Sequence, residues 1–294
     1  MRLKKSLLLS VALIISAFVN AQTPDKGIWL VHYNFTHKAD TTNGAKLYTE
    51  KFVLLLGKNA SVYRSLDKQL NEQAVANEVA SQVKASANPH AVDLTLHGTP
   101  ATTTDEYYQY LADKKLYTEK KIINYYVTEE PMPAINWKIT GDTMSFAGQR
   151  CQKATAHFKG RDYIAWFSPE LPFRNGPWKL NGLPGLIVEA YDARKEVVFS
   201  FAGFEDRSQS ADMVSIDPTD IKAGVDELER LHQAQLADPR GFARAMRGSG
   251  ARQKRSTDSP LNSISPADIK SINIVAAPES KIVINNPIEL PEKK

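Results

Sequence analysis

A stretch rich in proline and glycine, residues 168–185, limits most strongly how this chain can fold. It contains four prolines and three glycines within 18 residues, whereas the whole chain of 294 residues contains 16 and 15. Proline fixes φ and lacks an amide hydrogen, so this stretch cannot continue as a strand or a helix. We therefore expect a stiff, irregular loop. Its end, Leu183-Pro184-Gly185-Leu186, suits a type II turn in which Gly185 adopts the positive φ.

Short hairpins on both sides of this loop predict an antiparallel sheet. Residues 150–158 and 161–167 meet at Lys159-Gly160, which suits a two-residue turn. Such a turn pairs residues that share a face of the sheet: Phe158 with Arg161, Ala156 with Tyr163, Ala154 with Ala165, and, on the other face, His157 with Asp162. Beyond the loop, residues 186–191 and 196–201 predict a second hairpin that pairs Val188 with Phe199. Connections this short favour antiparallel strands over a parallel α/β fold.

The rest of the chain shows both strand and helix periodicity. Further strands are predicted at residues 28–37, in a hairpin of 47–56 with 61–64, and in a hairpin of 137–139 with 143–146 around Gly141-Asp142. Helical spacing of apolar residues predicts a helix within an insertion at 66–87 and another at 219–237, the latter capped by Asp217. Six tyrosines between residues 102 and 130 are interpreted as core or cross-strand pairs rather than a ligand-stacking surface.

These elements predict a mainly β fold. We expect one curved antiparallel sheet with a helical insertion and a C-terminal helix, in a single domain that spans residues 22–247. Residues 248–294 are rich in Ser, Pro, Arg and Asn, which predicts a largely disordered basic tail. Within that tail, Lys281-Ile282-Val283-Ile284 could dock as an edge strand.

The first 21 residues predict export. A basic start at Arg2, Lys4 and Lys5 precedes an apolar run that ends near Ala21, the pattern of a secretory signal peptide cleaved after Ala21. The run is too short to cross a bilayer, so we expect no membrane span in the mature protein. Export predicts a periplasmic location, with secretion as the alternative.

The charge of the mature chain argues against a nucleic-acid partner. Cleavage removes three cations, which leaves 34 basic and 33 acidic residues of the 37 and 33 in the whole chain. Nucleic-acid binding needs clustered cations that displace counterions from phosphates. One cluster survives, at Arg240, Arg244, Arg247, Arg252, Lys254 and Arg255. We interpret it as a solvated flexible segment in preference to a contact with anionic envelope lipid.

Catalytic and metal-binding signatures are weak. The chain has no His-Glu-x-x-His, Gly-x-Ser-x-Gly, P-loop or Gly-x-Gly-x-x-Gly motif, and His32 and His37 point to opposite faces of one strand. No metal or cofactor is therefore predicted. Cys151 stands alone, and about 20 Å of extended strand separates it from His157, too far for a nucleophile and its base. We interpret it as a buried small residue.

The central residues also carry a resemblance to a known family. They are Cys151-Gln152-Lys153-Ala154, the run Gly160 to Phe167, Gly176-Pro177-Trp178 and, above all, Gly182-Leu183-Pro184-Gly185-Leu186-Ile187. This pattern resembles the GLPGLI family of exported Gram-negative envelope proteins, closely from about Trp137 to Tyr191, whereas residues 66–120 and the tail have no clear counterpart. Membership implies an envelope protein of unknown activity near outer-membrane transport systems, with no catalytic residues to transfer. Phe167 stands where the family often has Tyr.

Two classes of function follow from these observations. The first is a periplasmic binding or accessory protein that holds an apolar small molecule in the concave sheet or docks on an outer-membrane protein. Its candidate ligand- or partner-binding residues are Arg161, Trp166, Arg174 and Trp178, because Trp and Arg dominate interface hot spots. The alternative is an envelope hydrolase that uses Cys151, with a base such as His32, or a carboxylate. A solely structural role for Trp166 and Trp178, as core residues that hold the loop down, is the competing interpretation.

Overall fold

The protein has a mainly β fold built around one large sheet. The computed structural model describes residues 24–42, 47–248, 264–276 and 284–292. Within these residues the sheet has 12 strands, all antiparallel to their neighbours except the parallel pair β15 and β8. From edge to edge the strands are β15 (Ile221–Lys222), β8 (Tyr125–Pro131), β7 (Lys115–Lys121), β6 (Glu106–Tyr110), β4 (Ala60–Ser65), β3 (Tyr48–Leu56), β2 (Trp29–His37), β13 (Val197–Asp206), β12 (Leu186–Asp192), β11 (Arg161–Ser168), β10 (Gln149–Phe158) and β9 (Lys138–Phe146).

Two strand pairs and three α-helices complete the described structure. β1 (Asp25–Lys26) pairs with β14 (Met213–Val214), and β5 (Val92–His97) pairs in parallel with β16 (Ile269–Val275). The helices are α1 (Leu66–Ala85), α2 (Val225–Ala237) and α3 (Pro239–Gly248), and a 3-10 turn spans Pro266–Asp268. None of the described helices is long and apolar enough to cross a membrane.

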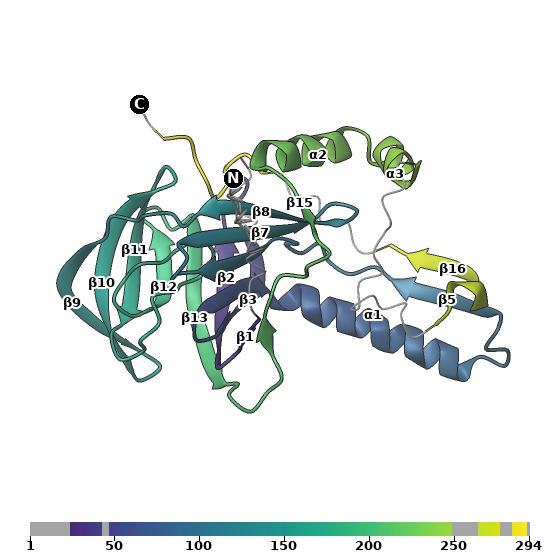
Figure 1. Ribbon diagram of the computed structural model, residues 1–294, viewed down its shortest axis with the longest axis horizontal. Helices are drawn as coiled ribbons and strands as arrows, with labels where there is room; N and C mark the ends of the chain where they lie inside the picture. Colours follow the sequence, from purple (N-terminus) through teal and green to yellow (C-terminus); the bar gives the residue numbers. More distant parts are fainter. Residues whose placement is uncertain (1–23, 43–46, 249–263, 277–283, 293–294) are drawn as a thin grey trace, which may run out of the picture.

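The large sheet is strongly curved, as the sequence predicts. In Figure 1, strands β9 to β12 bend around one end, while β7 and β8 run across the other end below α2. The main core cluster contains buried side chains from β2, β3 and β4 and from β10 to β13. Side chains from strands so far apart can meet only on the inner face of the curve. The core therefore lies inside the bend.

Three predicted strand regions form as expected. Residues 28–37 give β2, the next hairpin gives β3 and β4, and the central hairpin gives β10 and β11. The predicted central register is also confirmed: Phe158 lies opposite Arg161, and His157 opposite Asp162. The register follows from the two-residue turn, because Lys159 and Gly160 both adopt positive φ, as a type I′ hairpin requires.

The register of the following hairpin differs from the prediction. Ala190, rather than Val188, lies opposite Phe199, and the four-residue loop is 193–196 instead of the predicted 192–195. The Asp192 carboxylate fixes the shifted loop, because it accepts hydrogen bonds from the backbone N–H groups of Glu196 (2.6 Å) and Val197 (2.9 Å). A shift of two residues preserves the side-chain faces, and Phe199 stays in the core.

The predicted hairpin around Gly141-Asp142 does not form. Residues 138–146 instead make one continuous edge strand, β9, which pairs along its length with β10. The register shifts between Gln152 and Ala154, where β9 holds extra residues in a bulge that includes Gly141. A glycine inside a strand pattern indicated a turn, but here it accommodates a bulge at the sheet edge.

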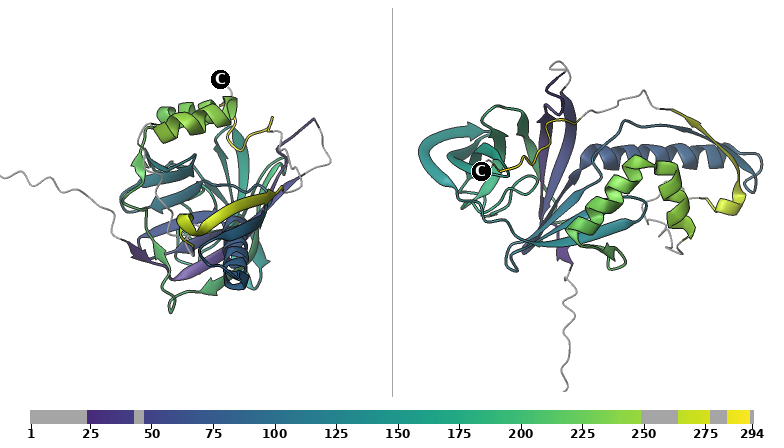
Figure 2. Two further views of the ribbon diagram at one scale, coloured as in Figure 1. Left: turned by 90° about the vertical axis from the view of Figure 1, so that its right-hand side faces the viewer. Right: turned by 90° about the horizontal axis from the view of Figure 1, so that it is seen from above.

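The predicted helical insertion is confirmed as α1, which begins at Leu66 and ends at Ala85. Ser65 caps its N-terminus by accepting a hydrogen bond from the Lys68 N–H at 2.9 Å. Val79 of α1 packs with Val92 and Leu94 of β5 in a small separate cluster. Figures 1 and 2 show α1, β5 and β16 projecting together from one side of the sheet. We call these three elements the arm.

The predicted C-terminal helix begins six residues later than expected. Residues 221–222 form β15 instead, and the N–H of Ala223 donates to the carbonyl of Val127 in β8 at 3.0 Å. The backbone groups of residues 221–223 are hydrogen-bonded to the open edge of β8 and therefore do not form a helical turn. Gly224 is therefore the N-cap of α2, in place of Asp217.

The tail contains two segments that are folded against the rest of the chain, which corrects the expectation of disorder for these residues. Residues 264–276 include β16, and residues 284–292 lie along the end of the large sheet. In the second segment, Asn285 and Asn286 donate backbone hydrogen bonds to the Ala39 carbonyl, and Leu290 donates one to the Lys159 carbonyl. We call residues 284–292 the strap. Most of the predicted edge strand 281–284 lies outside the described residues.

Candidate functional site

The proline- and glycine-rich loop 168–185 is ordered and folds into the bend of the sheet. Trp178, Leu180 and Leu183 are all buried in the main core cluster. The Trp178 ring stacks on Phe199 with centroids 6.4 Å apart and lies 5.7 Å from the Phe158 ring. The inner face, where the sequence suggested an apolar ligand, is therefore packed with the chain's own loop.

Buried polar groups join this loop to the far half of the sheet. Gln109 of β6 donates to the Trp178 carbonyl at 3.1 Å and accepts a hydrogen bond from Asn175 at 3.2 Å. Asn175 also donates to the hydroxyl of Ser61 in β4 at 2.9 Å. Because a buried amide without partners is costly, these contacts fix where the loop sits. The loop thus spans between β12 at one end and β6 at the other.

Gly185 plays a different role from the one predicted. The positive φ near the end of the loop belongs to Gly182, at 94°, and not to Gly185. A Cβ on Gly185 would lie 2.1 Å from the Ser168 carbonyl oxygen, closer than any real contact. Gly185 is needed because two backbone segments approach each other at this point. The predicted type II turn, with Gly185 at positive φ, is wrong.

Arg161, a candidate binding residue, is the centre of a buried ionic network. Its side chain has no exposed surface and pairs with Asp192 at 2.9 Å and Glu196 at 3.2 Å. The same guanidinium donates to the Asn286 side chain (2.6 Å) and to the carbonyls of Pro287 (2.7 Å) and Ile288 (2.8 Å). Every one of these last three acceptors belongs to the strap. Arg161 therefore holds the strap against the end of the sheet.

The other candidate residues do not gather at one surface. Trp178 is buried on the inner face, and Trp166, on the opposite face of β11 from Arg161, is 6% exposed with its ring 5.9 Å from Phe146. Arg174 is exposed and donates to the Gly182 carbonyl at 3.2 Å. Of the four, only Arg174 presents its charge to solvent. The binding role predicted for them stays a prediction without a shared site.

Cys151 lacks the surroundings of a nucleophile. The side chain is fully buried in the core cluster, and burial raises the pKa of its thiol to about 11. His32, the partner that a thiol mechanism would need, instead has its Nε2 atom 2.9 Å from the carboxylate of Glu205 in β13, which accepts a hydrogen bond from it. A buried thiol with a raised pKa contains little of the reactive thiolate at neutral pH.

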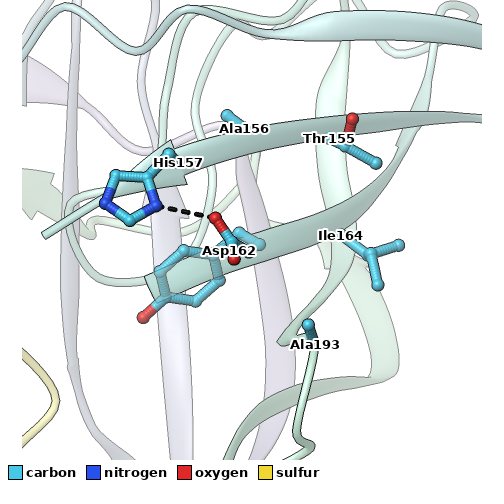
Figure 3. Close-up of a pocket in the computed structure, with 7 residues that line it drawn as sticks. Thr155, Ala156, His157, Asp162, Ile164 and Ala193 are labelled. Atoms are coloured by element: carbon cyan, nitrogen blue, oxygen red, sulfur yellow. Dashed lines mark hydrogen bonds and ion pairs between the residues drawn. The ribbon is translucent and has the colours of Figure 1, made fainter. Parts of the chain in front are cut away.

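A shallow depression of about 280 Å³ lies on the outer face of β10 and β11. Thr155, Ala156, His157, Asp162, Tyr163, Ile164 and Ala193 line it. In Figure 3, the imidazole of His157 points toward Asp162, and the two side chains lie 2.6 Å apart. The second ring nitrogen contacts Glu292 of the strap at 2.8 Å, and the two carboxylates together raise the pKa of His157. The cross-strand charge pair predicted from the register is present, but the depression is open and small.

A pair of facing acids lies on the outer face toward the other end of the sheet. Glu106 of β6 and Glu119 of β7 are directly opposite each other, and both are buried. The Tyr108 hydroxyl lies 3.2 Å from Glu106 and 3.5 Å from Glu119. Burial, with added repulsion from Glu106 and Asp220, raises the pKa of Glu119 to about 8. We call Glu106, Glu119 and Asp220, with Lys68 and Tyr108, the carboxyl cluster.

Each acid of this pair has a distinct electrostatic environment. Glu106 pairs with Lys68 at 3.1 Å, and both side chains are only 11% exposed. Glu119 instead shares a hydrogen bond with Asp220, which requires one of the two carboxyls to carry a proton. A carboxyl with a raised pKa beside one that is paired with a lysine is an arrangement that general acid–base catalysis uses. A signal in the sequence is the acidic residue that shares a strand face with a buried tyrosine, Glu106 with Tyr108 and Glu119 with Tyr117.

Another buried acid, Glu50, is fully satisfied by neutral donors. The hydroxyls of Tyr48 and Ser65 donate to its carboxylate, as do the N–H (2.9 Å) and hydroxyl (2.6 Å) of Thr103. These contacts fasten the segment before β6 to β3 and to the start of α1. Because these donors occupy its carboxylate oxygens, we assign Glu50 a structural role. Among the described residues, no group of three or more His, Cys, Asp or Glu side chains is arranged to hold a metal ion.

Comparison with known proteins gives a family of unknown function. A family model described as "Protein of unknown function (Porph_ging)" matches residues 68–189, which is less than half of the chain. The match agrees with the resemblance to a family without a known activity, and the GLPGLI assignment itself stays a proposal. The family model begins to match at residue 68, within α1, in a region where the resemblance to the GLPGLI family had no clear counterpart. No curated protein matches the chain.

Two solved structures of PNGF-II are similar in part. The crystal forms in space groups P21 and C2 share 9% and 11% sequence identity with this chain, with TM-scores of 0.48 and 0.46. Each alignment covers 69% of this chain and 32% of the PNGF-II chain. The protein thus spans about a third of the PNGF-II structures it matches. A likeness of this size assigns neither a ligand nor a functional residue here.

Proposed function

We propose that this protein is an exported binding or accessory protein of the cell envelope, and that it binds a partner protein through the arm. The predicted signal peptide and the resemblance to exported proteins support the location. The observation that carries the binding role is the exposed apolar surface of β16, where Ile272, Ile274 and Val275 are 44%, 70% and 43% exposed.

The arm offers the partner a strand edge as well as apolar side chains. Among the described strands, β16 pairs with β5 alone, so its other edge has unpaired backbone groups. Native proteins usually protect such an edge with charges, a bulge or a covering segment, because it recruits other strands. A two-stranded sheet is also only marginally stable by itself. A strand from a partner that adds to β16 would cover the isoleucines and complete the sheet.

A protein partner is favoured over an apolar small molecule for a steric reason. The inner face of the sheet, where such a molecule would bind, is occupied by Trp178, Leu180 and Leu183 of the loop. An internal ligand would have to displace these side chains, each of which contributes core burial. The exposed arm needs no such rearrangement.

Site-specific photocrosslinking in cells of the source organism tests the proposal. A photoreactive amino acid at position 274 should give an adduct of one defined mass in envelope fractions, and Ile272→Lys should abolish it. The matched control is position 236 on α2, because Leu236 is also strongly exposed, at 61%. Equal adducts at both positions, or none at 274, would contradict partner binding by the arm. Sequencing of the mature N-terminus checks export, since cleavage after Ala21 leaves Gln22 first.

The carboxyl cluster favours one second candidate, a carboxylate-dependent hydrolase. Glu119, whose pKa is raised to about 8, would donate a proton to a leaving group, while Glu106, paired with Lys68, would act as the base. We would expect both Glu119→Gln and Glu106→Gln to abolish any turnover of a panel of chromogenic glycosides and esters. Activity that survives both substitutions would eliminate this candidate without affecting the test of the arm.

A further inference from the structure

We propose that the surface beneath the strap is a peptide-binding site, and that the strap occupies the place of an acidic segment of a partner protein. The end of β2, the turn between β10 and β11, and the loop 168–185 form this surface, which we call the strap site. In Figure 1 the strap lies near the C-terminal end at the upper left and the arm projects to the right. The inference is therefore independent of the partner proposed for the arm.

The sheet itself orients the Arg161 guanidinium toward the strap. Its Nη1 atom donates to Asp192 at 2.9 Å and to Glu196 at 3.2 Å, both near the second hairpin of the sheet. Its Nη2 and Nε atoms donate to the strap, to the Asn286 side chain and to two backbone carbonyls. Because the two carboxylates fix the guanidinium, its other donors are in position for any segment that presents the same acceptors. Such preorganisation lowers the cost of binding.

The strap site recognises both ends of the Asn286 side-chain amide. Its Oδ1 atom accepts a hydrogen bond from Arg161 at 2.6 Å, and its Nδ2 atom donates to the Lys38 carbonyl at 2.8 Å and to Glu196 at 3.2 Å. The backbone carbonyl of the same residue lies 2.7 Å from Nε2 of His37. Asn286 is only 6% exposed, so an apolar side chain at this position would leave buried polar groups unpaired. The site therefore selects an asparagine.

Two lysines from separate segments converge on Glu289 of the strap. Lys179 of the loop lies 2.6 Å from one carboxylate oxygen, and Lys159 of the β10–β11 turn lies 3.0 Å from the other. Although partial burial opposes ionisation, the two lysines hold the pKa of Glu289 below its usual value. In the same turn, a Cβ on Gly160 would lie 2.5 Å from the Leu290 carbonyl oxygen, so glycine permits the close approach of the strap. The site selects an acid three residues after the asparagine.

A competing segment can displace the strap. Residues 284–292 form neither helix nor strand, and they are held by separate hydrogen bonds and ion pairs and by the packing of Ile288 on the main core cluster. A tethered segment competes as a ligand at an effective concentration of about millimolar. A partner segment with the same Asn and Glu and with contacts of its own would overcome this competition. The strap of a second copy would make only the same contacts and would lack the advantage of the tether.

Peptide binding to the full mature chain tests the inference. A fluorescent synthetic peptide of residues 284–292 is titrated with the parent and with Glu289→Lys, a variant whose own strap is repelled by Lys159 and Lys179. The variant should bind the peptide at least tenfold more tightly than the parent, because its strap no longer competes. Glu170→Lys makes the same charge change at an exposed position beyond the other end of β11 and should bind the peptide as the parent does. Circular dichroism confirms that each variant is folded.

The sequence requirements of the peptide separate recognition from non-specific adsorption. Peptides that carry Asn286→Ala or Glu289→Lys should bind the Glu289→Lys chain at least tenfold more weakly than the unaltered peptide. A random peptide library selected on the same chain should enrich an asparagine followed three residues later by an acid. Equal peptide affinity for the parent and both variants, or enrichment of sequences without an acid, would overturn the proposal. A concentration-dependent dimer of the parent would also overturn it, because the strap site would then belong to a second copy.

Discussion

At the scale of single residues, the structure assigns most of the notable side chains to the fold. Packing explains three residues that are conspicuous in the sequence. Cys151 is a buried thiol and Trp178 is a buried aromatic side chain of the core, while Gly185 allows a close backbone contact. Arg161 has five polar partners and no exposed surface. The exception is Glu119, whose pKa is raised to about 8 by burial and by its acidic neighbours.

Replacement of Gly185 by Ala should destabilise the protein. The added methyl would collide with the Ser168 carbonyl, which is backbone and cannot rotate away. Overpacking of this kind costs typically about 1–3 kcal/mol in the free energy of unfolding. Urea denaturation measures it. Gly141→Ala is the matched control, because nothing lies within 4 Å of the new Cβ there, and a comparable loss for both variants would contradict this account.

Glu119→Gln should reduce the pH dependence of stability. The folded state holds a proton on Glu119 up to about pH 8, whereas an exposed carboxyl releases it near 4.5, so the parent loses stability as pH rises between these values. The expected difference is on the order of 3 kcal/mol. It is measured by urea unfolding at pH 5, 6.5 and 8.5. Glu129→Gln, at a side chain 51% exposed, should change the slope little, and identical slopes for parent and Glu119→Gln would refute the assignment.

At the scale of elements, local turn chemistry predicts some strands well and others poorly. Lys159-Gly160 specifies its hairpin because two positive φ values suit one turn type. Asp192 changes the next hairpin through side-chain hydrogen bonds that a count of residues cannot reveal. β15 forms where a helix was expected, because the edge of β8 offers backbone partners from a distant part of the chain.

Deletion of the strap should destabilise the sheet it covers. Without residues 284–294, Arg161 loses the Asn286 side chain and two carbonyl acceptors, and the end of β2 loses its cover. We expect a loss of roughly 2–3 kcal/mol in unfolding free energy. Thermal and urea denaturation of the truncated chain measure it. Glu292→Gln, at an exposed position of the strap, serves as the control, and an unchanged midpoint in the truncated chain would show that the strap is dispensable.

At the scale of the whole molecule, the loop 168–185 joins strands from the two halves of the curved sheet. It leaves β11, enters the bend, bonds to Gln109 of β6 and returns to β12. A sheet of many strands has few contacts between its far edges, so a loop that bridges the bend couples them. This arrangement predicts that the large sheet unfolds as one unit.

Trp178→Ala tests that coupling. Loss of a buried aromatic costs about 3–5 kcal/mol, and here it removes contacts to Phe158 and Phe199 on separate strands. We expect the parent to unfold in one transition that coincides by fluorescence and by circular dichroism, and the variant to unfold at lower urea concentration. Leu236→Ala, on the exposed face of α2, should have little effect. Separate transitions in the parent would mean that the loop does not couple the two ends.

The amino-acid sequence alone determined those features that depend on residues close together in the chain. Alternating side chains gave the β class, a two-residue turn set the central register, and proline and glycine excluded regular structure from residues 168–185. The tertiary structure decided where that loop goes, that Arg161 holds a strap more than 120 residues away, and that Glu106 and Glu119 share a buried site. These results depend on burial and on contacts between distant segments, whose free energies exist only once the chain has folded.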